Sequence, residues 1–387
     1  MKIGIDIRMI GKKRTGDEAV FFNLVKNLAE MDSKNEYFLF TDRDPQKNQE
    51  LKTEIDKLKL ADNFKVIFIN CPNRFWWNLW ALPHYLKKNT VDVFHTQYIA
   101  PFWLPKSPHR RSAGEAEIKL VLTIHDISFN YFPEYIRKSD LFFLRNLIPR
   151  SIRRANKIIA VSESEKKNIV EFYKIPPEKV ACAYNGVDFS RFNKKYSTDE
   201  IKKINTRYKI PDTKYILYIG TLQPRKNIPV LIEAMRDLDT PLILAGNRKA
   251  RNFDPKIDEA IEKFHLEDKI IFPGWIDEED KPALFKLASC FVFPSLYEGF
   301  GIPIIEAMAA ETPVVCSDIP VLREIGKDAA LFCDPKKSEE FARKIQEILS
   351  DENLRKNLIK KGTEVAKTYT WQKNAEKILK IYSSLAS

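Results

Sequence analysis

The stretch Pro294–Glu306, PSLYEGFGIPIIE, decides the fold because a strand exit, two glycines, two glutamates and a helix start fall together in it. The apolar run SCFVF before it is typical of a buried parallel strand, and the proline before IIEAMAA predicts the first turn of a helix. Gly299 and Gly301 allow the backbone to approach a ligand closely, and N–H groups at a helix start attract anions. We therefore expect a phosphate to bind here, with Glu298 and Glu306 facing one pocket.

Strand and helix patterns alternate in both halves of the chain, which is typical of α/β proteins with parallel sheets. The strands expected in the first half are KIGIDIR, EYFLF, FKVIFI, VDVFH, KLVLTIHD, KIIAVSES and KVACAY. Those expected in the second half are YILYIG, PLILAG, KIIFPG, CFVFP and TPVVCS. A turn is expected at Asn185 and Gly186, and Ser162 or Ser164 is expected to cap the helix EKKNIVEFY.

A polar, charged segment after Phe192 separates the two halves and predicts a domain boundary. We expect an α/β architecture of two doubly wound, Rossmann-like domains that face each other across a cleft, residues 1–192 and residues 193–368. The remaining residues, 369–387, are expected to form a helix that crosses back to the first domain.

The composition indicates a folded protein with an anionic partner. The 64 Lys and Arg residues against 53 Asp and Glu residues give a net charge of +11, which suits a nucleotide phosphate or an anionic lipid surface. A nucleic-acid partner is disfavoured because the basic residues are spread along the chain without a recognition motif. The five cysteines lack metal-ligand spacing and are expected to be free thiols. Without a leader or a long apolar run, the protein is expected to be cytoplasmic.

Two further strand exits carry candidate site residues. Arg225 and Lys226 follow the strand YILYIG, in a loop that leads into a helix, and are expected to meet the two-glutamate motif at one sheet edge. Two cations and a row of backbone N–H groups would then converge where a diphosphate could lie. His125 ends the strand KLVLTIHD, at the carboxyl end where open parallel sheets bind ligands.

Two segments of the first half leave alternatives open. The loop that ends at Gly16 has the outline of a phosphate-binding loop, but the acids after it equally indicate a helix capped by its own carboxylates. The polar, basic segment 104–118 is expected to be an exposed loop and is assigned no role.

A helix rich in aromatic residues is expected over RFWWNLWALPHYLKK. Its rings at Phe75, Trp76, Trp77 and Trp80 suit a membrane-surface or acceptor-binding element. Aromatic stripes more often pack inside a protein, so we expect most of these rings to lie in the core.

The chain resembles the retaining glycosyltransferases of family four, which have the GT-B fold. The resemblance extends over essentially the whole chain and is carried by HDISFNYFPE, VSESEKKNI, AYNGVD, YIGTLQPRKN and FPGWIDEEDKPALFKLASCFVFPSLYEGFGIPIIEAMAAETPVVCSD. Glu298 and Glu306, with seven residues between them, reproduce the signature pair of that family.

The resemblance implies a role for each candidate. Glu306 would bind the ribose hydroxyls of a nucleotide sugar, and Glu298 would contact the sugar near its anomeric carbon. Arg225 and Lys226 would neutralise the diphosphate leaving group, and His125 would hydrogen-bond the donor sugar. Backbone donors to the distal phosphate and the sugar would come from Phe300, Gly301, Ile302 and Pro303.

The loop before the first helix departs from the family pattern, which has a Gly-Ile-Gly-Arg-Tyr-like helix start where this chain has GDEAVF. This difference weakens the assignment of Gly16 to phosphate binding. Lys13 and Arg14 are expected to compensate in part.

The resemblance implies a retaining transfer of a hexose from GDP-mannose or UDP-glucose, with a slight preference for GDP-mannose because TLQPRKN and HDISF are similar to mannosyltransferase-like members. The acceptor would be a glycan, a lipid-linked saccharide or another hydroxyl, as in polysaccharide biosynthesis, with peripheral contact to an anionic membrane at its inner face. No metal or separate cofactor is expected, because fixed cations stabilise the leaving group. The alternatives are a GT-B sugar-nucleotide epimerase or phosphorylase, or a catalytically silent carbohydrate-binding protein.

Overall fold

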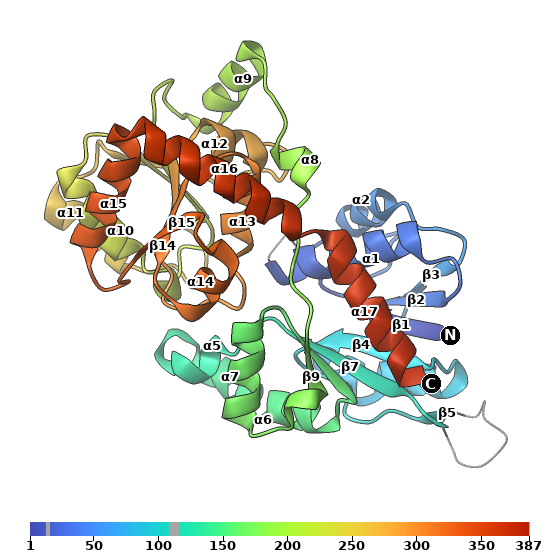
Figure 1. The fold of residues 1–387 in the computed structure, drawn as a ribbon. Coiled ribbons are helices and arrows are strands. Elements are labelled where there is room, and N and C mark those ends of the chain that lie inside the picture. The colour runs from blue at the N-terminus through green and yellow to red at the C-terminus, as the bar shows by residue number, and fades with distance from the viewer. Residues whose placement is uncertain (13–15, 108–115, 387) are drawn as a thin grey trace. The chain divides into compact units, whose positions relative to one another are not determined.

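The computed structural model describes residues 1–12, 16–107 and 116–386 (Figure 1). The chain divides into two compact units. Unit 1 comprises residues 1–185 together with residues 371–387, and unit 2 comprises residues 186–370. The chain therefore passes between the units twice, and unit 1 is discontinuous in sequence.

Unit 1 is built on a parallel sheet with the strand order β3-β2-β1-β4-β7-β8-β9. All seven strands expected from the first half of the sequence are confirmed. Their bounds are β1 Lys2–Asp6, β2 Glu36–Thr41, β3 Phe64–Phe68, β4 Val93–Gln97, β7 Lys119–Ile124, β8 Lys157–Ala160 and β9 Val180–Cys182. In β7 every residue after the first is buried, as expected where helices cover both faces of a parallel sheet.

The described helices of unit 1 connect these strands or pack on them. They are α1 Gly16–Met31, α2 Gln49–Leu58, α3 Arg74–Trp76, α4 Leu82–Lys88, α5 Ser128–Tyr131, α6 Lys138–Arg154, α7 Glu163–Tyr173 and α17 Trp371–Ala386. Shorter turns are the π-helical turn η1 Trp77–Ala81 and the 3-10 turns η2 Pro133–Tyr135 and η3 Pro177–Lys179. Of the two serines expected to cap α7, Ser162 is the cap, because its hydroxyl accepts a hydrogen bond from the Glu165 N–H at 3.0 Å.

The C-terminal helix α17 belongs to unit 1, where it packs against α1 and β4. Tyr382 of this helix is buried, and its hydroxyl lies 2.5 Å from Nδ1 of His95 on β4. The other ring nitrogen of His95, Nε2, lies 2.7 Å from the hydroxyl of Thr123. Burial, reinforced by the neighbouring His125, lowers the pKa of His95 to about 3, so this imidazole is neutral and structural.

We expect Tyr382→Phe to lower the free energy of unfolding of unit 1 by about 1–3 kcal/mol, because a ring nitrogen of buried His95 loses its partner. Urea unfolding followed by circular dichroism measures this difference. Tyr135→Phe is the control, since Tyr135 is exposed and its change should fall within about 0.5 kcal/mol of zero. Equal stability of the two variants would contradict the role assigned to the Tyr382 hydroxyl.

The turn expected at Asn185 and Gly186 is wrong. Residues 183–188 form neither a turn nor a bend, and the chain passes from unit 1 to unit 2 within them. The backbone groups here bond to distant segments instead of to one another. The Asn374 side chain donates to the carbonyl of Tyr184 at 2.8 Å, and the Val187 N–H donates to the carbonyl of Tyr369 at 3.0 Å.

The expectation that most rings of the aromatic helix lie in the core is also wrong. Phe75, Trp76 and Trp80 are 51%, 46% and 56% exposed, and of the four rings only Trp77 is buried. The inner face of this segment is filled by Trp77 together with smaller aliphatic residues of η1 and α4. The aromatic character of the sequence therefore reflects an exposed face as well as a buried one.

The segment 104–118, expected to be an irregular loop, contains a short antiparallel pair. β5 Lys106–Ser107 pairs with β6 Ala116–Glu117, and residues 108–115 between them lie outside the described residues. The expected exposure of that inner part stays a prediction.

Unit 2 contains a second parallel sheet, with the order β12-β11-β10-β13-β14-β15. The strands are β10 Ile216–Ile219, β11 Leu242–Ala245, β12 Ile270–Gly274, β13 Cys290–Phe293, β14 Val314–Ser317 and β15 Ala330–Cys333. The five expected strands are confirmed, and β15 is a sixth. Its four residues, ALFC, form an edge strand and are all apolar, but so short a run does not distinguish a strand from a helical segment by its pattern.

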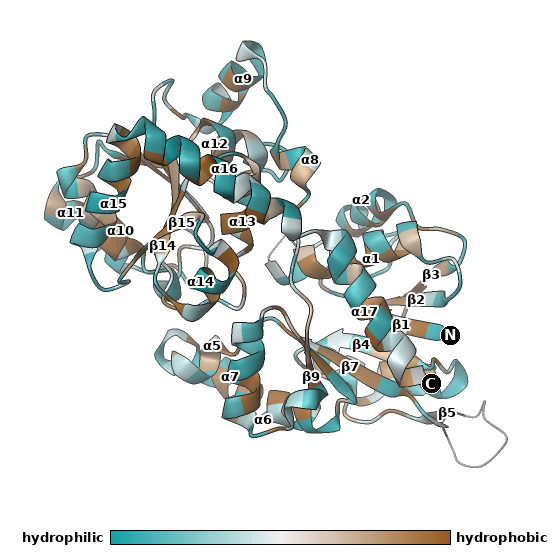
Figure 2. Ribbon diagram, in the orientation of Figure 1, coloured by the Kyte–Doolittle hydropathy of each residue, from teal (hydrophilic) through white to brown (hydrophobic). Residues whose placement is uncertain are grey.

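The helices of unit 2 are α8 Phe189–Phe192, α9 Thr198–Tyr208, α10 Ile228–Ala234, α11 Lys256–Phe264, α12 Lys281–Leu287, α13 Ile302–Ala309, α14 Pro320–Gly326, α15 Ser338–Ser350 and α16 Glu352–Thr368. Two 3-10 turns are η4 Pro224–Lys226 and η5 Met235–Asp237. Figure 2 shows α13 in brown and much of α16 in teal, in agreement with a buried α13 and a solvent-facing side of α16. The polar segment after Phe192, which predicts a domain boundary, contains α9, which Ser197 and Glu200 begin with a capping box.

All five cysteines are free thiols, as expected; three are buried, and Cys71 and Cys182 are partly exposed. None of the helices in the described residues combines the length and the apolar character that crossing a bilayer requires.

Candidate functional site

The strand order of unit 2 reverses between β10 and β13, which lie side by side. In open parallel sheets, ligands bind at the carboxyl ends of the strands at such a reversal. The loop after β10 carries Arg225 and Lys226, and the loop after β13 carries Glu298. The two loops are joined by a hydrogen bond from the Leu296 N–H to the carbonyl of Arg225 at 2.9 Å. The expected meeting of Arg225 and Lys226 with the two-glutamate motif is confirmed for the loop that carries Glu298.

Glu298 is paired directly with both cations. Nζ of Lys226 lies 2.5 Å from Oε1 of Glu298, and Nη1 of Arg225 lies 3.6 Å from Oε2. The three side chains are nearly buried, so their charges act in a medium that screens them less than water does. Together they carry one net positive charge at a sheet edge.

Contacts with the surrounding chain hold these cations in place. Nη1 of Arg225 donates to the carbonyl of Tyr297 at 2.5 Å, and Nζ of Lys226 lies 5.2 Å from the centre of the Phe293 ring. The next residue, Asn227, has a φ of 57° and donates to the carbonyl of Pro294 at 3.1 Å. The loop is therefore attached to β13 at several points, which preorganises its charges.

Helix α13 begins at this edge, and Gly301 at its start requires glycine. Its φ is +95°, and a Cβ placed on it would lie 2.8 Å from Cδ2 of Leu322. Phe300 before it is buried against Tyr369, with ring centres 5.6 Å apart. These contacts fix the direction of the backbone N–H groups at the helix start.

One expected backbone donor of this segment is wrong. Pro303 has no amide hydrogen, so it cannot donate to a phosphate or a sugar. Its ring instead presets φ in the first turn of α13, where a missing N–H costs the helix nothing. Phe300, Gly301 and Ile302 keep their N–H groups and remain candidates.

Glu306 lies one turn into α13 and is buried, and its partner is Lys281 at the start of α12. Nζ of Lys281 lies 2.8 Å from Oε1 and 2.6 Å from Oε2 of Glu306. Burial raises the pKa of Glu306, and the Lys281 ammonium opposes this rise. For Lys281, burial favours the neutral amine, but Glu306 and Glu278 outweigh it and raise the pKa. We take the pair to be ionised at neutral pH.

Sequence reasoning did not single out Lys281. It stands in the run DEEDK, which has the composition of a solvated surface segment. Pro282 is the feature that could have pointed to Lys281. A proline in the first helical turn places the residue before it at a helix start, here beside a neighbouring strand exit.

His125 lies in unit 1, at the exit of β7, as expected. Its Nε2 is 2.9 Å from Oε1 of Gln97, and its Nδ1 is 4.0 Å from Oδ1 of Asp17 on α1. The imidazole is nearly buried between Phe21 and Tyr98. The structure thus brings His125 close to the start of α1, and its role toward a sugar stays a prediction.

The loop between β1 and α1 is held by a carboxylate of α1. Oε1 of buried Glu18 accepts a hydrogen bond from the Gly11 N–H at 2.6 Å, and Nη1 of Arg43 donates to the Gly11 carbonyl at 2.9 Å. The Gly11 amide is therefore bound to the protein itself, which favours the helix capped by its own acid. Gly16 begins α1. The expected contributions of Lys13 and Arg14 lie outside the described residues.

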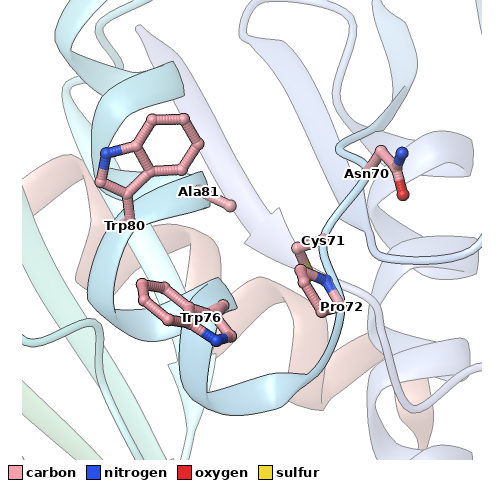
Figure 3. A pocket seen from close by; sticks show the side chains of 6 residues that line it. All are labelled: Asn70, Cys71, Pro72, Trp76, Trp80 and Ala81. Atoms are coloured by element: carbon pink, nitrogen blue, oxygen red, sulfur yellow. The ribbon is translucent and has the colours of Figure 1, made fainter.

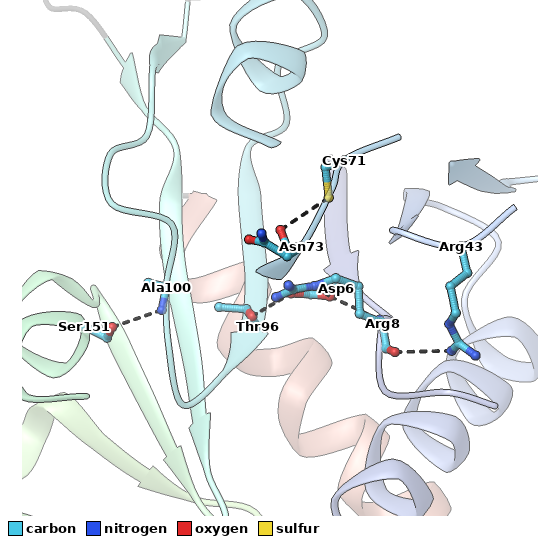
Figure 4. A network of polar contacts seen from close by, with 8 residues as sticks. All are labelled: Asp6, Arg8, Arg43, Cys71, Asn73, Thr96, Ala100 and Ser151. Carbon is cyan, nitrogen blue, oxygen red and sulfur yellow. Dashed lines mark hydrogen bonds and ion pairs between the residues drawn. The ribbon is translucent and has the colours of Figure 1, made fainter. Parts of the chain in front are cut away.

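A second polar network lies where the strand order of unit 1 reverses, between β1 and β4 (Figure 4). Asp6 accepts from Nε and Nη2 of Arg8 at 2.9 and 2.7 Å and from the hydroxyl of Thr96 at 3.0 Å. The Arg8 guanidinium lies 4.6 Å from the centre of the Trp77 ring. Sequence reasoning missed this network, which Asp6 at the end of β1 could have indicated.

Two protein families match the chain, one over each half. Glycosyltransferase Family 4 matches residues 15–191, and Glycosyl transferases group 1 matches residues 199–365. The chain is also 32% identical over 289 residues to the O-antigen chain mannosyltransferase B of Escherichia coli, with 72% of each chain covered. The chain belongs to the family 4 glycosyltransferases.

Other proteins are similar to this glycosyltransferase in sequence or structure. The O-antigen chain mannosyltransferase RfbU of Salmonella typhimurium is 32% identical over 231 residues, 59% of this chain and 60% of that protein. A sucrose-phosphate synthase from Thermosynechococcus elongatus superposes with a TM-score of 0.76 at 20% identity over 100% of this chain and 99% of that one. Anabaena HepE in complex with UDP-glucose gives 0.75 at 19% identity over 99% and 100%. The expected GT-B fold class is confirmed.

Within the described ranges of the glycosyltransferase, no group of three or more His, Cys, Asp or Glu side chains is placed to hold a metal ion.

Proposed function

We propose that this glycosyltransferase transfers a hexose, with mannose preferred, from a nucleotide diphosphate sugar to a hydroxyl of a glycan or lipid-linked saccharide, with retention of the anomeric configuration. The observation that carries the proposal is the fixed cluster of Arg225, Lys226 and Glu298 at the reversal of the strand order in unit 2. The preference for mannose is supported by relatives named as mannosyltransferases.

In this proposal each charged residue acts on one part of the donor. Arg225 and Lys226 stabilise the diphosphate, and the N–H groups at the start of α13 bind its distal phosphate. Glu298 positions the two cations and contacts the sugar, while Glu306 accepts hydrogen bonds from the ribose hydroxyls. His125 hydrogen-bonds the sugar, a role that rests on the family resemblance.

The transfer needs no side-chain nucleophile. The bond from the anomeric carbon to the phosphate oxygen breaks, and the acceptor oxygen bonds to that carbon on the same face. The acceptor proton passes to the departing phosphate oxygen, so protons and charge balance. Negative charge grows on the diphosphate during this step, and fixed cations in a poorly screened position lower its free energy.

We expect activity to persist in a chelator, because two side-chain cations replace a divalent ion in this proposal. Transfer from GDP-mannose and from UDP-glucose would be measured in EDTA and with added Mg²⁺ or Mn²⁺. Loss of transfer in EDTA, restored by one divalent ion, would contradict the metal-independent mechanism.

The donor is tested by thermal shift with GDP, UDP, ADP and their sugars. A nucleotide that binds the folded protein raises the midpoint of unfolding, by an amount that follows its concentration relative to its dissociation constant. GDP and GDP-mannose are expected to give the largest shifts. A larger shift with UDP-glucose would change the donor and leave the transferase proposal standing, whereas no shift with any nucleotide would contradict it.

The expected cytoplasmic location stays a prediction.

A further inference from the structure

Among the described residues of unit 1, two places are candidates for contact with a sugar ring. One is a pocket of about 280 Å³ beside the helical segment after β3, lined by Asn70, Cys71, Pro72, Trp76, Trp80 and Ala81 (Figure 3). Asn70 is the one side chain of that lining that both donates and accepts hydrogen bonds strongly, so most sugar hydroxyls would lose their water there without a replacement. The other is the carboxyl edge of β4 and β7, beside the start of α1, where polar side chains meet.

The register of the sheet brings Gln97 beside His125. Gln97 is the last residue of β4 and pairs with Thr123 of β7. Side chains two residues apart on a strand point to the same face, so His125 at the exit of β7 follows on the face that Gln97 and Thr123 share. Oε1 of Gln97 lies 2.9 Å from Nε2 of His125.

The backbone after Gln97 is held in an unusual conformation. Tyr98 has a φ of 54°, which a tyrosine seldom adopts, and its N–H donates to the carbonyl of Thr123 at 3.0 Å. The centre of its ring lies 5.5 Å from that of the nearly buried His125 imidazole. Non-glycine residues persist in this conformation where their surroundings impose it, and they cluster at ligand sites. The amide of Gln97 and the imidazole therefore have fixed positions relative to each other.

The contact with Gln97 decides which nitrogen of His125 carries the hydrogen. An amide oxygen can only accept, so Nε2 of the imidazole is the donor. In the neutral imidazole the other nitrogen, Nδ1, then keeps a lone pair and accepts. Nδ1 faces Oδ1 of Asp17 at 4.0 Å, which is too far for a hydrogen bond, and an ionised carboxylate brings no hydrogen. Two acceptors that face each other in this way suit a ligand group that supplies the hydrogen.

The Gln97 amide is oriented toward His125 at a cost. Its nitrogen, Nε2, is buried and has no hydrogen-bond partner among the described residues. Buried polar atoms without a partner are uncommon in proteins and call for an explanation. A side chain that leaves its own donor unpaired while its oxygen contacts the imidazole is expected to act on that imidazole more than to stabilise the fold.

Charged and titratable groups approach His125 from several elements. Asp17 lies on α1, His95 lies on β4, Tyr98 follows that strand, and Asp126 is the next residue in the chain. A second proton on His125 would occupy Nδ1 and remove the acceptor. The experiments below are therefore done at a pH of about 8.5, well above the ordinary pKa of an imidazole.

We propose that Gln97 is a positioning residue, which keeps the hydrogen of His125 on Nε2 so that Nδ1 accepts a hydrogen bond from a hydroxyl of the transferred sugar. The proposal rests on the proposed function, from which it takes the contact of His125 with the sugar. It adds the direction of that hydrogen bond and the chemistry of the group recognised. A hydroxyl satisfies Nδ1, whereas a fluorine at the same carbon has no hydrogen to donate.

The first experiment locates the hydrogen by NMR of the ligand-free protein labelled at its histidine nitrogens, with His125→Gln to identify the signals. The unchanged protein is expected to carry the hydrogen on Nε2. Gln97→Met is expected to move it to Nδ1, because Nε2 then faces an apolar side chain while Nδ1 faces the carboxylate of Asp17. Gln97→Glu keeps an acceptor beside Nε2 and is expected to keep the hydrogen there. Gln46→Met is the matched control, since Gln46 is an exposed glutamine of the same unit.

The second experiment measures what the sugar adds to donor affinity, by titration with the nucleotide sugar and with the matching nucleoside diphosphate. The donor is whichever of GDP-mannose and UDP-glucose gives the larger thermal shift. Gln97→Met is expected to bind the nucleotide sugar about tenfold more weakly, the value of one hydrogen bond, and the diphosphate equally well. Gln97→Glu is expected to keep most of the affinity, and Gln46→Met all of it.

Donors in which fluorine replaces one sugar hydroxyl at a time identify the group that Nδ1 recognises. One member of the series is expected to bind about tenfold more weakly than the parent donor to the unchanged protein. The same member should bind like the parent donor to Gln97→Met, in which Nδ1 no longer accepts.

A hydrogen on Nδ1 in the unchanged protein would overturn the proposal, as would an unchanged donor affinity in Gln97→Met. A fluorinated series in which every member binds like the parent, or a loss confined to the KM of the acceptor, would also overturn it. Absence of nucleotide binding in the unchanged protein would instead count against the transferase proposal, because the hydrogen on His125 is located without any ligand.

Discussion

Lys226→Ala is expected to lower kcat by roughly 10²- to 10³-fold, the effect typical of removing one fixed group that stabilises growing charge. The Lys226 ammonium is nearly buried and lies 2.5 Å from Glu298, so its position is set before the donor binds. After its removal, Arg225 at 3.6 Å is the one cation that the described residues leave beside Glu298, and the cluster loses its net positive charge. The leaving diphosphate then meets a neutral edge.

The loss of affinity in Lys226→Ala should depend on how many phosphates the nucleotide carries. Affinity for a nucleoside diphosphate should fall more than affinity for the matching monophosphate, because the distal phosphate is the group that the cation stabilises. Isothermal titration with both nucleotides measures the difference. Lys263→Ala on α11 is the control, since that lysine is exposed and far along the chain from the site. An unchanged kcat in Lys226→Ala would show that the cluster does not act on the leaving group.

Lys281→Met is expected to weaken nucleotide binding by roughly ten- to a hundredfold, although this lysine is assigned no contact with the ligand. Its ammonium donates a hydrogen bond to Oε1 of Glu306 at 2.8 Å and lies 2.6 Å from Oε2, and thereby orients the group proposed to accept the ribose hydroxyls. Removing it leaves a buried carboxylate without its counter-ion, and such a group avoids the penalty by binding a proton.

The pH dependence distinguishes this role from simple damage. Burial already raises the pKa of Glu306, and without Lys281 the pKa rises further. A protonated carboxyl cannot accept two hydrogen bonds in the same way, so affinity of the variant should fall as the pH is lowered and recover as it is raised. The unchanged protein should show a flatter profile, and Lys281→Arg should restore much of it.

Lys286→Met provides a matched control on the same helix. Lys286 pairs with Glu311, but both side chains of that pair are partly exposed, and such ion pairs contribute little. Its nucleotide affinity is expected to equal that of the unchanged protein. A parallel loss in both variants would mean that α12 as a whole, and not the pair with Glu306, supports the site.

The sheets were largely predictable, because strands buried on both faces are continuous apolar runs. CFVF and KLVLTI illustrate the rule, and every residue of the first is buried. The edge strand β15 was not predicted, because its four apolar residues are too short a run to show a period. Residues 183–188 were mistaken for a turn because Asn-Gly favours one locally, whereas distant partners such as Asn374 decide the backbone there.

The candidate site was predictable where its residues follow strands in sequence. Arg225, Lys226 and Glu298 all stand just after a strand, so parallel order alone brings them to one edge. Lys281 reaches Glu306 from the start of a neighbouring helix; Pro282 marks that helix start, but no local pattern shows that the Lys281 side chain turns inward. Trp76 was expected in the core and is exposed, because hydrophobic character alone does not tell a buried ring from an exposed one.

The discontinuity of unit 1 imposes an order on biosynthesis. Residues 186–370 are synthesised before α17, so unit 1 cannot be completed until the whole of unit 2 has been made. Until α17 is made, the surface of α1 and β4 that it covers is exposed to water, and His95 lacks the Tyr382 hydroxyl as a partner. The nascent chain must therefore keep this apolar face from aggregating until α17 has been made, and it is this late helix that completes the unit to which β1 and α1 belong.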